Sequence, residues 1–166
     1  MNAAGLFSDR IASMLPYKVP KISFYKGEYF KTGKIKGLKR LIYAVPPEDG
    51  LSLGIHTRNY LDGQISFGPN VYPVDDVDYS IDTGNAKDFA EAINKYFHVF
   101  LKETDLTPDY AGIRPKIGEG KTSTDFYIRD DGEESPFVNL IGIESPGLTC
   151  SIEIANRVLN MIRDHL

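Results

Sequence analysis

One stretch joins an apolar, strand-like segment to the last helix-like segment: Asn139-Leu140-Ile141-Gly142-Ile143-Glu144-Ser145-Pro146-Gly147-Leu148-Thr149. Residues 137–143 are mostly apolar and predict a strand, whereas apolar residues at 148, 152, 155, 159 and 162 have helical spacing. Two glycines and a proline make a tight loop with free backbone N–H groups. A helix N-terminus carries partial positive charge and favours an anion, so we expect a ligand-binding loop. The alternative is an ordinary strand-to-helix turn, which needs only one glycine and a cap.

Working outward, the remaining chain predicts a mixture of helices and short strands without strict alternation. Helical spacing occurs over 6–15, ended by Pro16, and over 86–101, with Asn85 as a possible N-cap. The strand-like segments are 21–25, 28–30, 41–45, 51–58, 64–67, 110–116 and 124–128, with 75–81 as a possible edge strand. Gly27 interrupts the first pair, and Asp62-Gly63 signals a hairpin. We therefore expect one α+β domain, residues 1–166, with a mostly antiparallel sheet flanked by helices.

Composition excludes several classes of protein. The 166 residues carry 19 Lys and Arg against 23 Asp and Glu, a net charge of −4, which argues against binding nucleic acid through phosphate contacts. No apolar run approaches the ~18 residues of a membrane span, and residues 1–5 do not resemble a secretory signal. A single cysteine excludes an internal disulfide and indicates a reducing, cytoplasmic compartment. One cysteine and three histidines are too few for a Cys-rich zinc site, so we expect no metal.

Two polar residues stand in apolar, strand-like surroundings. Arg114 lies in Tyr110-Ala111-Gly112-Ile113-Arg114-Pro115, and a buried guanidinium needs an anionic partner. Arginine suits a carboxylate because it donates two parallel hydrogen bonds, and the alternative is an internal salt bridge. His56 lies in Gly54-Ile55-His56-Thr57-Arg58, where it is either a base or an ordinary sheet histidine.

These segments together resemble the flavin-dependent oxidoreductases of the D-amino-acid oxidase superfamily, and most closely the L-2-hydroxyglutarate oxidases and dehydrogenases. The matching blocks occur in the family's order: Asn2–Leu6 with Ser8-Asp9, Lys26–Tyr29, Leu41–Pro46, Leu53–His56, Asp62-Gly63, Gly68–Asn70, Asp109–Lys116, Asp125-Phe126 and Asn139–Thr149. The resemblance covers essentially the whole chain, and its last block is long and specific.

The resemblance implies a role for each matching position. It implies FAD as cofactor, with Asn2, Ala3, Ala4 and Gly5 touching it from the nucleotide-domain side. Gly142, Ile143, Glu144, Ser145, Pro146, Gly147, Leu148 and Thr149 resemble the loop around the flavin ring. Arg114 and Tyr110 are substrate-binding candidates, with Arg114 on the carboxylate, and His56 is the catalytic base for the hydroxyl proton. The substrate that the resemblance implies is a small 2-hydroxy acid, L-2-hydroxyglutarate. The resemblance also implies that the cytoplasmic protein attaches peripherally to the inner membrane.

One departure from the family leaves two readings open. The family begins with a βαβ unit that carries Gly-x-Gly-x-x-Gly and holds the FAD pyrophosphate, and this sequence contains no such unit. The chain is either the substrate-side portion of a larger or split enzyme, working with a separate N-terminal FAD-binding chain, or a non-catalytic remnant that has lost the flavin. We expect the chain alone to hold FAD weakly and to self-associate through the uncovered surface.

Overall fold

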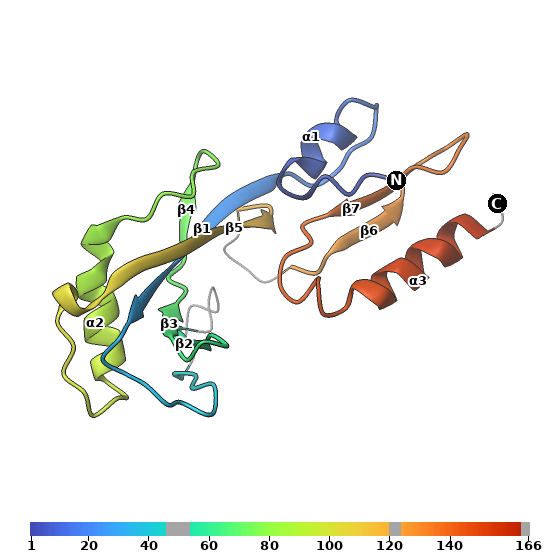
Figure 1. Cartoon of the computed structure of the whole chain (residues 1–166). Coiled ribbons are helices and arrows are strands. Elements are labelled where there is room, and N and C mark those ends of the chain that lie inside the picture. The colour runs from blue at the N-terminus through green and yellow to red at the C-terminus, as the bar shows by residue number, and fades with distance from the viewer. Residues whose placement is uncertain (46–53, 120–123, 164–166) are drawn as a thin grey trace. The chain divides into compact units, whose positions relative to one another are not determined.

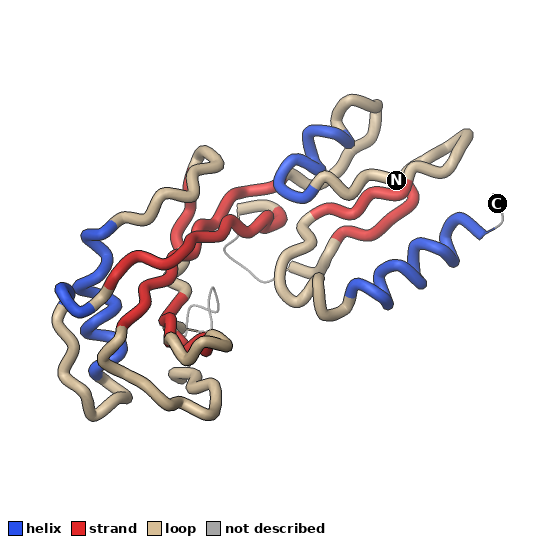
Figure 2. Tube along the Cα trace, viewed as in Figure 1, coloured by secondary structure: helices blue, strands red, loops and turns tan. Residues whose placement is uncertain are grey.

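The computed structural model describes residues 1–45, 54–119 and 124–163. Its architecture is α+β with mostly antiparallel sheets, as predicted (Figures 1 and 2). The contacts divide the chain into two compact units: unit 1 comprises residues 1–25 and 114–166, and unit 2 comprises residues 26–113.

Unit 2 is built on a five-stranded sheet in the order β2-β3-β1-β4, with β5 also paired to β1. Its strands are β1 (Ile22–Thr32), β2 (His56–Asn59), β3 (Ile65–Gly68), β4 (Tyr72–Val74) and β5 (Thr107–Ile117), of which β1 and β5 continue into unit 1. β3 pairs antiparallel with both β1 and β2, with Phe67 opposite Phe30 and Thr57. The predicted hairpin at Asp62-Gly63 joins β2 to β3 and is confirmed.

The core of unit 2 lies between this sheet and helix α2 (Ala86–Asn94), which Figure 1 shows beside the strands. Phe30 packs on Phe89 with ring centroids 4.7 Å apart, and both side chains are buried. Short 3-10 helices flank α2 as η2 (Thr83–Asn85) and η3 (Glu103–Asp105).

A buried carboxylate connects four segments of unit 2. The Glu28 side chain is inaccessible to solvent and accepts four hydrogen bonds, from the Tyr72 hydroxyl and Asp82 N–H at Oε1 and from the Asn70 and Asn85 amides at Oε2. A buried charge is tolerated only when it is this fully hydrogen-bonded. Glu28 therefore ties β1 to β4, to the loop after β3 and to the start of η2.

Unit 1 contains a two-stranded antiparallel sheet and helices from both ends of the chain. Strand β6 (Tyr127–Asp130) pairs with β7 (Val138–Ile141), and helix α3 (Ser151–Ile162) packs on them through Ile154 and Val158. Near the N-terminus, η1 (Gly5–Phe7) runs into α1 (Ser8–Ala12). No helix in the described ranges is long and apolar enough to cross a membrane.

Several predicted elements differ from the structure. β1 is continuous through Gly27. The glycine there leaves room for Pro69, because a Cβ at this position would lie 2.8 Å from the Pro69 Cβ. α2 ends at Asn94, and that side chain bonds both backbone groups of Leu101, so 95–101 is not helical. Residues 41–45 and 75–81 form no strand, and β4 at 72–74 was not predicted. The start of the predicted strand 51–58 lies outside the described residues.

Candidate functional site

Two cations on one face of β5 share a single carboxylate in unit 1. The predicted arginine, Arg114, and Lys116 are two residues apart, so both side chains project from the same face of the strand. Glu144 lies between them, with Oε2 3.6 Å from Arg114 Nη1 and Oε1 3.3 Å from Lys116 Nζ. The structure therefore connects Arg114 to the loop that follows β7.

The charges of this cluster do not cancel. Two cations and one carboxylate leave an excess of one positive charge in a partly buried setting. The Lys116 and Glu144 side chains are 10% and 18% exposed, whereas that of Arg114 is 32% exposed. Among residues 1–45, 54–119 and 124–163, the guanidinium has one ion-pair contact, at 3.6 Å from Nη1, which leaves further N–H groups for an added anion.

The loop 142–149 is a tight turn whose glycines are required by its shape. Gly142 has φ +72°, and a Cβ there would meet Ile117 Cγ1 at 2.5 Å. A Cβ on Gly147 would meet Ile143 Cγ2 at 2.4 Å, and its N–H donates to the Glu144 carbonyl at 2.6 Å. This packing explains why the sequence has glycine at both positions.

The end of this loop offers backbone donors at the start of α3. Within the described part of the chain, the N–H groups of Leu148 and Thr149 donate to no acceptor. Ser145, Pro146, Leu148 and Thr149 are exposed, whereas Ile143 and Glu144 are half-buried. Open N–H groups at the positive end of a twelve-residue helix suit an electron-rich ligand edge.

The N-terminal loop is held by Asn2, which has a structural role in the fold. Its side-chain amide is buried and donates to the Ser8 carbonyl and to Asn139 Oδ1, each at 2.7 Å. Its backbone forms a parallel bridge to Asn139. Ala3, Ala4 and Gly5 remain exposed, and Gly5 has φ +57° with no atom near the position of a Cβ. Among the four predicted N-terminal residues, these three present open backbone surface.

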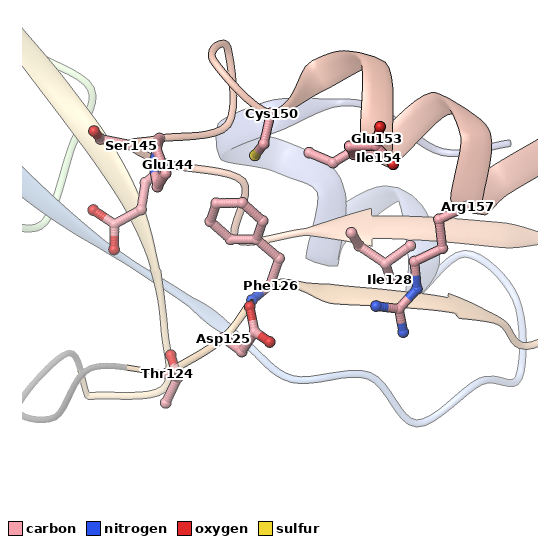
Figure 3. Close-up of a pocket in the computed structure, with 11 residues that line it drawn as sticks. Thr124, Asp125, Phe126, Ile128, Glu144, Ser145, Cys150, Glu153, Ile154 and Arg157 are labelled. Carbon is pink, nitrogen blue, oxygen red and sulfur yellow. Dashed lines mark hydrogen bonds between the residues drawn. The ribbon is translucent and has the colours of Figure 1, made fainter.

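A pocket of about 570 Å³ lies beside the loop, between the start of β6 and α3 (Figure 3). Its floor includes Phe126, Ile128 and Ile154, and charged side chains stand at its edges. Figure 3 shows the Cys150 thiol directed toward the Phe126 ring and the Glu144 carboxylate directed away from it. The pocket is thus continuous with the loop, while the charge of Glu144 is used in the Arg114 cluster.

In unit 2, the predicted base His56 belongs to a stack of aromatic rings. Its ring is stacked on Tyr43, with centroids 4.4 Å apart, and meets the Tyr29 ring edge-on at 6.5 Å. Tyr29 in turn is stacked on Tyr110 at 4.4 Å. His56 Nδ1 lies 3.0 Å from the Gly54 carbonyl oxygen. A carbonyl only accepts, so Nδ1 carries the proton and Nε2 is left as the basic nitrogen.

The same stack continues to Arg58. The Arg58 guanidinium lies over the Tyr110 ring at 4.8 Å and over the Tyr60 ring at 4.7 Å, and Nη1 donates to the Tyr60 hydroxyl at 3.2 Å. Tyr60 donates to Asp109 Oδ2 at 2.5 Å. Burial and this hydrogen bond raise the pKa of Tyr60 to about 12, so the hydroxyl stays protonated.

The predicted site residues therefore fall into two groups. His56 and Tyr110 share one aromatic stack in unit 2, whereas Arg114 and the loop 142–149 meet in unit 1. Arg58 and Lys116 were not predicted as site residues from the sequence. Each follows a predicted residue by two positions on the same strand, and this alternation is the signal that could have found it.

Comparison with known proteins shows the family. The model of the FAD dependent oxidoreductase family, DAO, matches residues 1–161, and the chain belongs to this family. Its members use FAD, in agreement with the cofactor expected from the sequence.

Two kinds of named enzyme are similar to the chain. The chain is 38% identical over 96% of its length to the mitochondrial L-2-hydroxyglutarate dehydrogenase of Arabidopsis thaliana, of which it covers 36%. It is 30% identical over 98% of its length to the glycerol 3-phosphate oxidase of Mycoplasma genitalium, of which it covers 42%.

A solved structure shares the fold. The L-alpha-glycerophosphate oxidase of Mycoplasma pneumoniae, reduced with dithionite and with FAD bound, matches 98% of this chain and 42% of its own with a TM-score of 0.78 at 24% identity. The chain thus spans about two fifths of the length of these relatives.

The residues present fit the ring portion of FAD. The flavin gains electron density on reduction, and the open Leu148 and Thr149 N–H groups at the start of α3 are suitable donors for it. Ala3, Ala4 and Gly5 offer an exposed backbone edge. No Gly-x-Gly-x-x-Gly unit for the pyrophosphate occurs in the sequence.

Proposed function

We propose that this chain is the substrate-binding and flavin-ring-binding portion of an enzyme that oxidises a 2-hydroxy acid, L-2-hydroxyglutarate, to the 2-oxo acid. The main support is the Arg114 cluster, which has a surplus positive charge beside the loop 142–149. The 38% identity to an L-2-hydroxyglutarate dehydrogenase favours this substrate. Bound FAD supplies the two-electron acceptor for such an oxidation.

In this proposal Arg114 binds the substrate carboxylate next to the hydroxyl-bearing carbon. Its guanidinium can form two parallel hydrogen bonds with a carboxylate, which fixes the orientation as well as the position of the acid. Glu144 keeps the guanidinium in place, and Lys116 compensates the charge of Glu144 when the substrate carboxylate arrives. Tyr110, whose ring is stacked on Tyr29 in unit 2, is the second substrate-binding residue of the proposal.

His56 removes the hydroxyl proton in the same proposal. The Gly54 carbonyl fixes the proton on Nδ1, so Nε2 carries the lone pair that accepts the proton from the substrate hydroxyl. Stacking on Tyr43 and the edge contact with Tyr29 hold the ring plane. Loss of this proton makes removal of the neighbouring C–H hydride favourable.

The proposal includes a further FAD-binding portion of the enzyme, on the same or a separate chain. Helix α3 packs on the sheet through Ile154 and Val158, yet Leu148 and Ile152 are 91% and 75% exposed. Exposed large apolar side chains in and beside a helix are typical of a surface that is covered in the assembled protein. We assign this surface to the portion that holds the FAD pyrophosphate, and self-association is the competing occupant.

Glycerol 3-phosphate is the second candidate substrate, because two Mycoplasma oxidases and a Caloramator mitchellensis dehydrogenase with this substrate in their names also match the chain. It too has a secondary hydroxyl and an anionic group. A non-catalytic role is the third possibility, and it is distinguished by the experiment below.

The test is to co-express the chain with the part of the Arabidopsis relative that it does not cover, and to isolate the complex by gel filtration. We expect a yellow complex whose flavin is bleached anaerobically by L-2-hydroxyglutarate, and more slowly or not at all by glycerol 3-phosphate. Arg114→Ala should weaken substrate binding by about 2–5 kcal/mol, and Arg114→Lys should restore part of it. Bleaching by glycerol 3-phosphate alone would show that glycerol 3-phosphate, and not L-2-hydroxyglutarate, is the substrate. A yellow complex that neither compound bleaches would favour the non-catalytic role.

The chain alone provides the matching control. A helix terminus contributes ~0.3–2 kcal/mol to anion binding, whereas micromolar affinity needs about 8 kcal/mol. We therefore expect FAD to separate from the isolated chain on gel filtration. A stoichiometric flavin complex of the chain alone would contradict the division of roles proposed here.

A further inference from the structure

Arg58 is a fixed cation whose charge is not neutralised by an ion pair. Within the described residues no carboxylate oxygen lies within 4.0 Å of its guanidinium nitrogens. The nearest acidic neighbour, Asp109, accepts the Tyr60 hydroxyl at Oδ2 and faces Lys31 Nζ at 3.7 Å from Oδ1. Lys31, Arg58 and Asp109 together therefore carry a surplus of one positive charge.

The two tyrosine rings hold this cation in place without neutralising it. Tyr60 and Tyr110 lie 4.7 Å and 4.8 Å from the guanidinium carbon, distances at which the ring faces attract a cation. The tyrosine hydroxyls engage only part of the guanidinium, which has five N–H donors. Arg58 is exposed, so its remaining donors are accessible to a ligand.

Arg58 also stands at a defined position relative to the proposed base. His56 and Arg58 are alternate residues of β2 and project from the same face, while Thr57 between them is buried on the other. Two residues of a strand span about 6.8 Å. This length is comparable to that of a ligand whose hydroxyl-bearing carbon is joined to a terminal anionic group through two further chain atoms.

We propose that Arg58 binds the terminal anionic group of the substrate, and that it selects 2-hydroxy acids with a second carboxylate over those with an apolar end. This inference rests on the proposed function, since it takes His56 as the group that meets the hydroxyl. A terminal phosphate has the same chemistry and can form the same paired hydrogen bonds, so both anions enter the test.

The test is ligand titration of the full chain followed by NMR, observing the Arg58 guanidinium and His56 ring signals. The probes are L-2-hydroxyglutarate, L-2-hydroxyvalerate, in which a methyl group replaces the terminal carboxylate, and glycerol 3-phosphate. We expect L-2-hydroxyglutarate to shift both signals and to bind about tenfold more tightly than L-2-hydroxyvalerate.

The variants separate a binding role from a structural one. Arg58→Met should weaken L-2-hydroxyglutarate about tenfold and leave L-2-hydroxyvalerate unchanged, and Arg58→Lys should recover part of the loss. The control is Arg129→Met, because Arg129 also lies over a tyrosine ring, Tyr127 at 5.2 Å, but in unit 1. Far-UV circular dichroism establishes that each variant is folded.

The possible outcomes distinguish the inference from the function on which it rests. If L-2-hydroxyglutarate shifts His56 but Arg58→Met binds it as tightly as the wild type, the role of Arg58 is wrong and the proposed function stands. If only glycerol 3-phosphate shifts Arg58, the anion site stands and the choice of 2-hydroxyglutarate is wrong. If no ligand shifts the Arg58 signal, the inference is overturned.

Discussion

Replacing the buried Glu28 by glutamine should lower the free energy of unfolding of the chain by about 2–3 kcal/mol at pH 7. Glutamine has nearly the same shape, so the change removes the charge and one acceptor while leaving no cavity. The effect therefore measures the loss of one hydrogen bond and of the negative charge that strengthens the other three, since the side chain is inaccessible to solvent.

The magnitude follows from which partners can adapt. If the new NH₂ group takes the place of Oε2, it faces the amide nitrogens of Asn70 and Asn85. Asn70 cannot turn its amide, because its Oδ1 already accepts the Glu28 N–H at 2.7 Å, whereas Asn85 can. In the opposite orientation the Asp82 N–H loses its acceptor. Either way one charge-assisted bond, worth about 1.5–3 kcal/mol, is lost and the others become neutral.

The destabilisation should depend on pH. Burial raises the pKa of Glu28, but the hydrogen bonds from Asp82, Asn70, Tyr72 and Asn85 outweigh it and hold the pKa below its ordinary value of 4.5. Because the folded-state pKa lies below the unfolded one, this stabilisation is present above pH 4.5 and is lost as the pH falls through the folded-state pKa. The difference between wild type and variant should therefore shrink in acid.

The assay is urea unfolding followed by far-UV circular dichroism, since the chain contains no tryptophan, at pH 7 and at pH values below 4.5. Glu91→Gln is the matched control, because Glu91 is exposed on α2 and should change the stability by less than about 0.5 kcal/mol. Equal stability of Glu28→Gln and wild type at pH 7, or an equal loss in acid for both, would refute the reasoning.

Three further changes should have distinct effects. Gly142→Ala should destabilise the chain by about 2–4 kcal/mol in urea unfolding, because alanine is strained at φ +72° and its Cβ clashes with Ile117 of β5. Gly33→Ala is the control and should destabilise the chain by under about 1 kcal/mol, because the space around Gly33 is open. Phe89→Ala should lower the free energy of unfolding by about 3–5 kcal/mol, because the Phe89 side chain is 1% exposed. Phe100→Ala should lower it little in the same measurement, because Phe100 is 78% exposed. Ile152→Ser should reduce self-association of the isolated chain in analytical ultracentrifugation with unchanged circular dichroism; an unaltered sedimentation profile would exclude this face.

Much of the fold could be predicted because periodicity reports which residues are buried. The last helix and the hairpin at Asp62-Gly63 depend on local sequence, and both are confirmed. The face of α3 that packs on the sheet was predicted wrongly: the apolar residues at 148, 152, 155 and 159 are exposed, whereas Ile154 and Val158 contact the strands. The end of α2 depends on a contact between Asn94 and Leu101, seven residues apart, which competes with continued helix. Periodicity contains no information on such a side-chain bond, so the predicted helix was too long.

The candidate site could be predicted only in part, because it depends on contacts between side chains from segments far apart in the sequence. Arg114 and His56 could be predicted because they are polar residues among apolar ones. Lys116 and Arg58, two positions further along the same strands, have no such local signal. That Glu144 joins Arg114 to Lys116 depends on a contact between segments 28 residues apart in sequence. No local pattern predicts which cations such a carboxylate will reach.

Unit 2 is one uninterrupted stretch of chain, residues 26–113, placed within the sequence of unit 1. It is entered through β1 and left through β5, and these two strands are paired with each other. A segment whose entry and exit strands are hydrogen-bonded neighbours can be exchanged for a homologous segment without new linkers. Recombination at these two points would thus give a new set of residues around β2 to a chain that keeps the loop 142–149, so the two units can diverge independently in evolution.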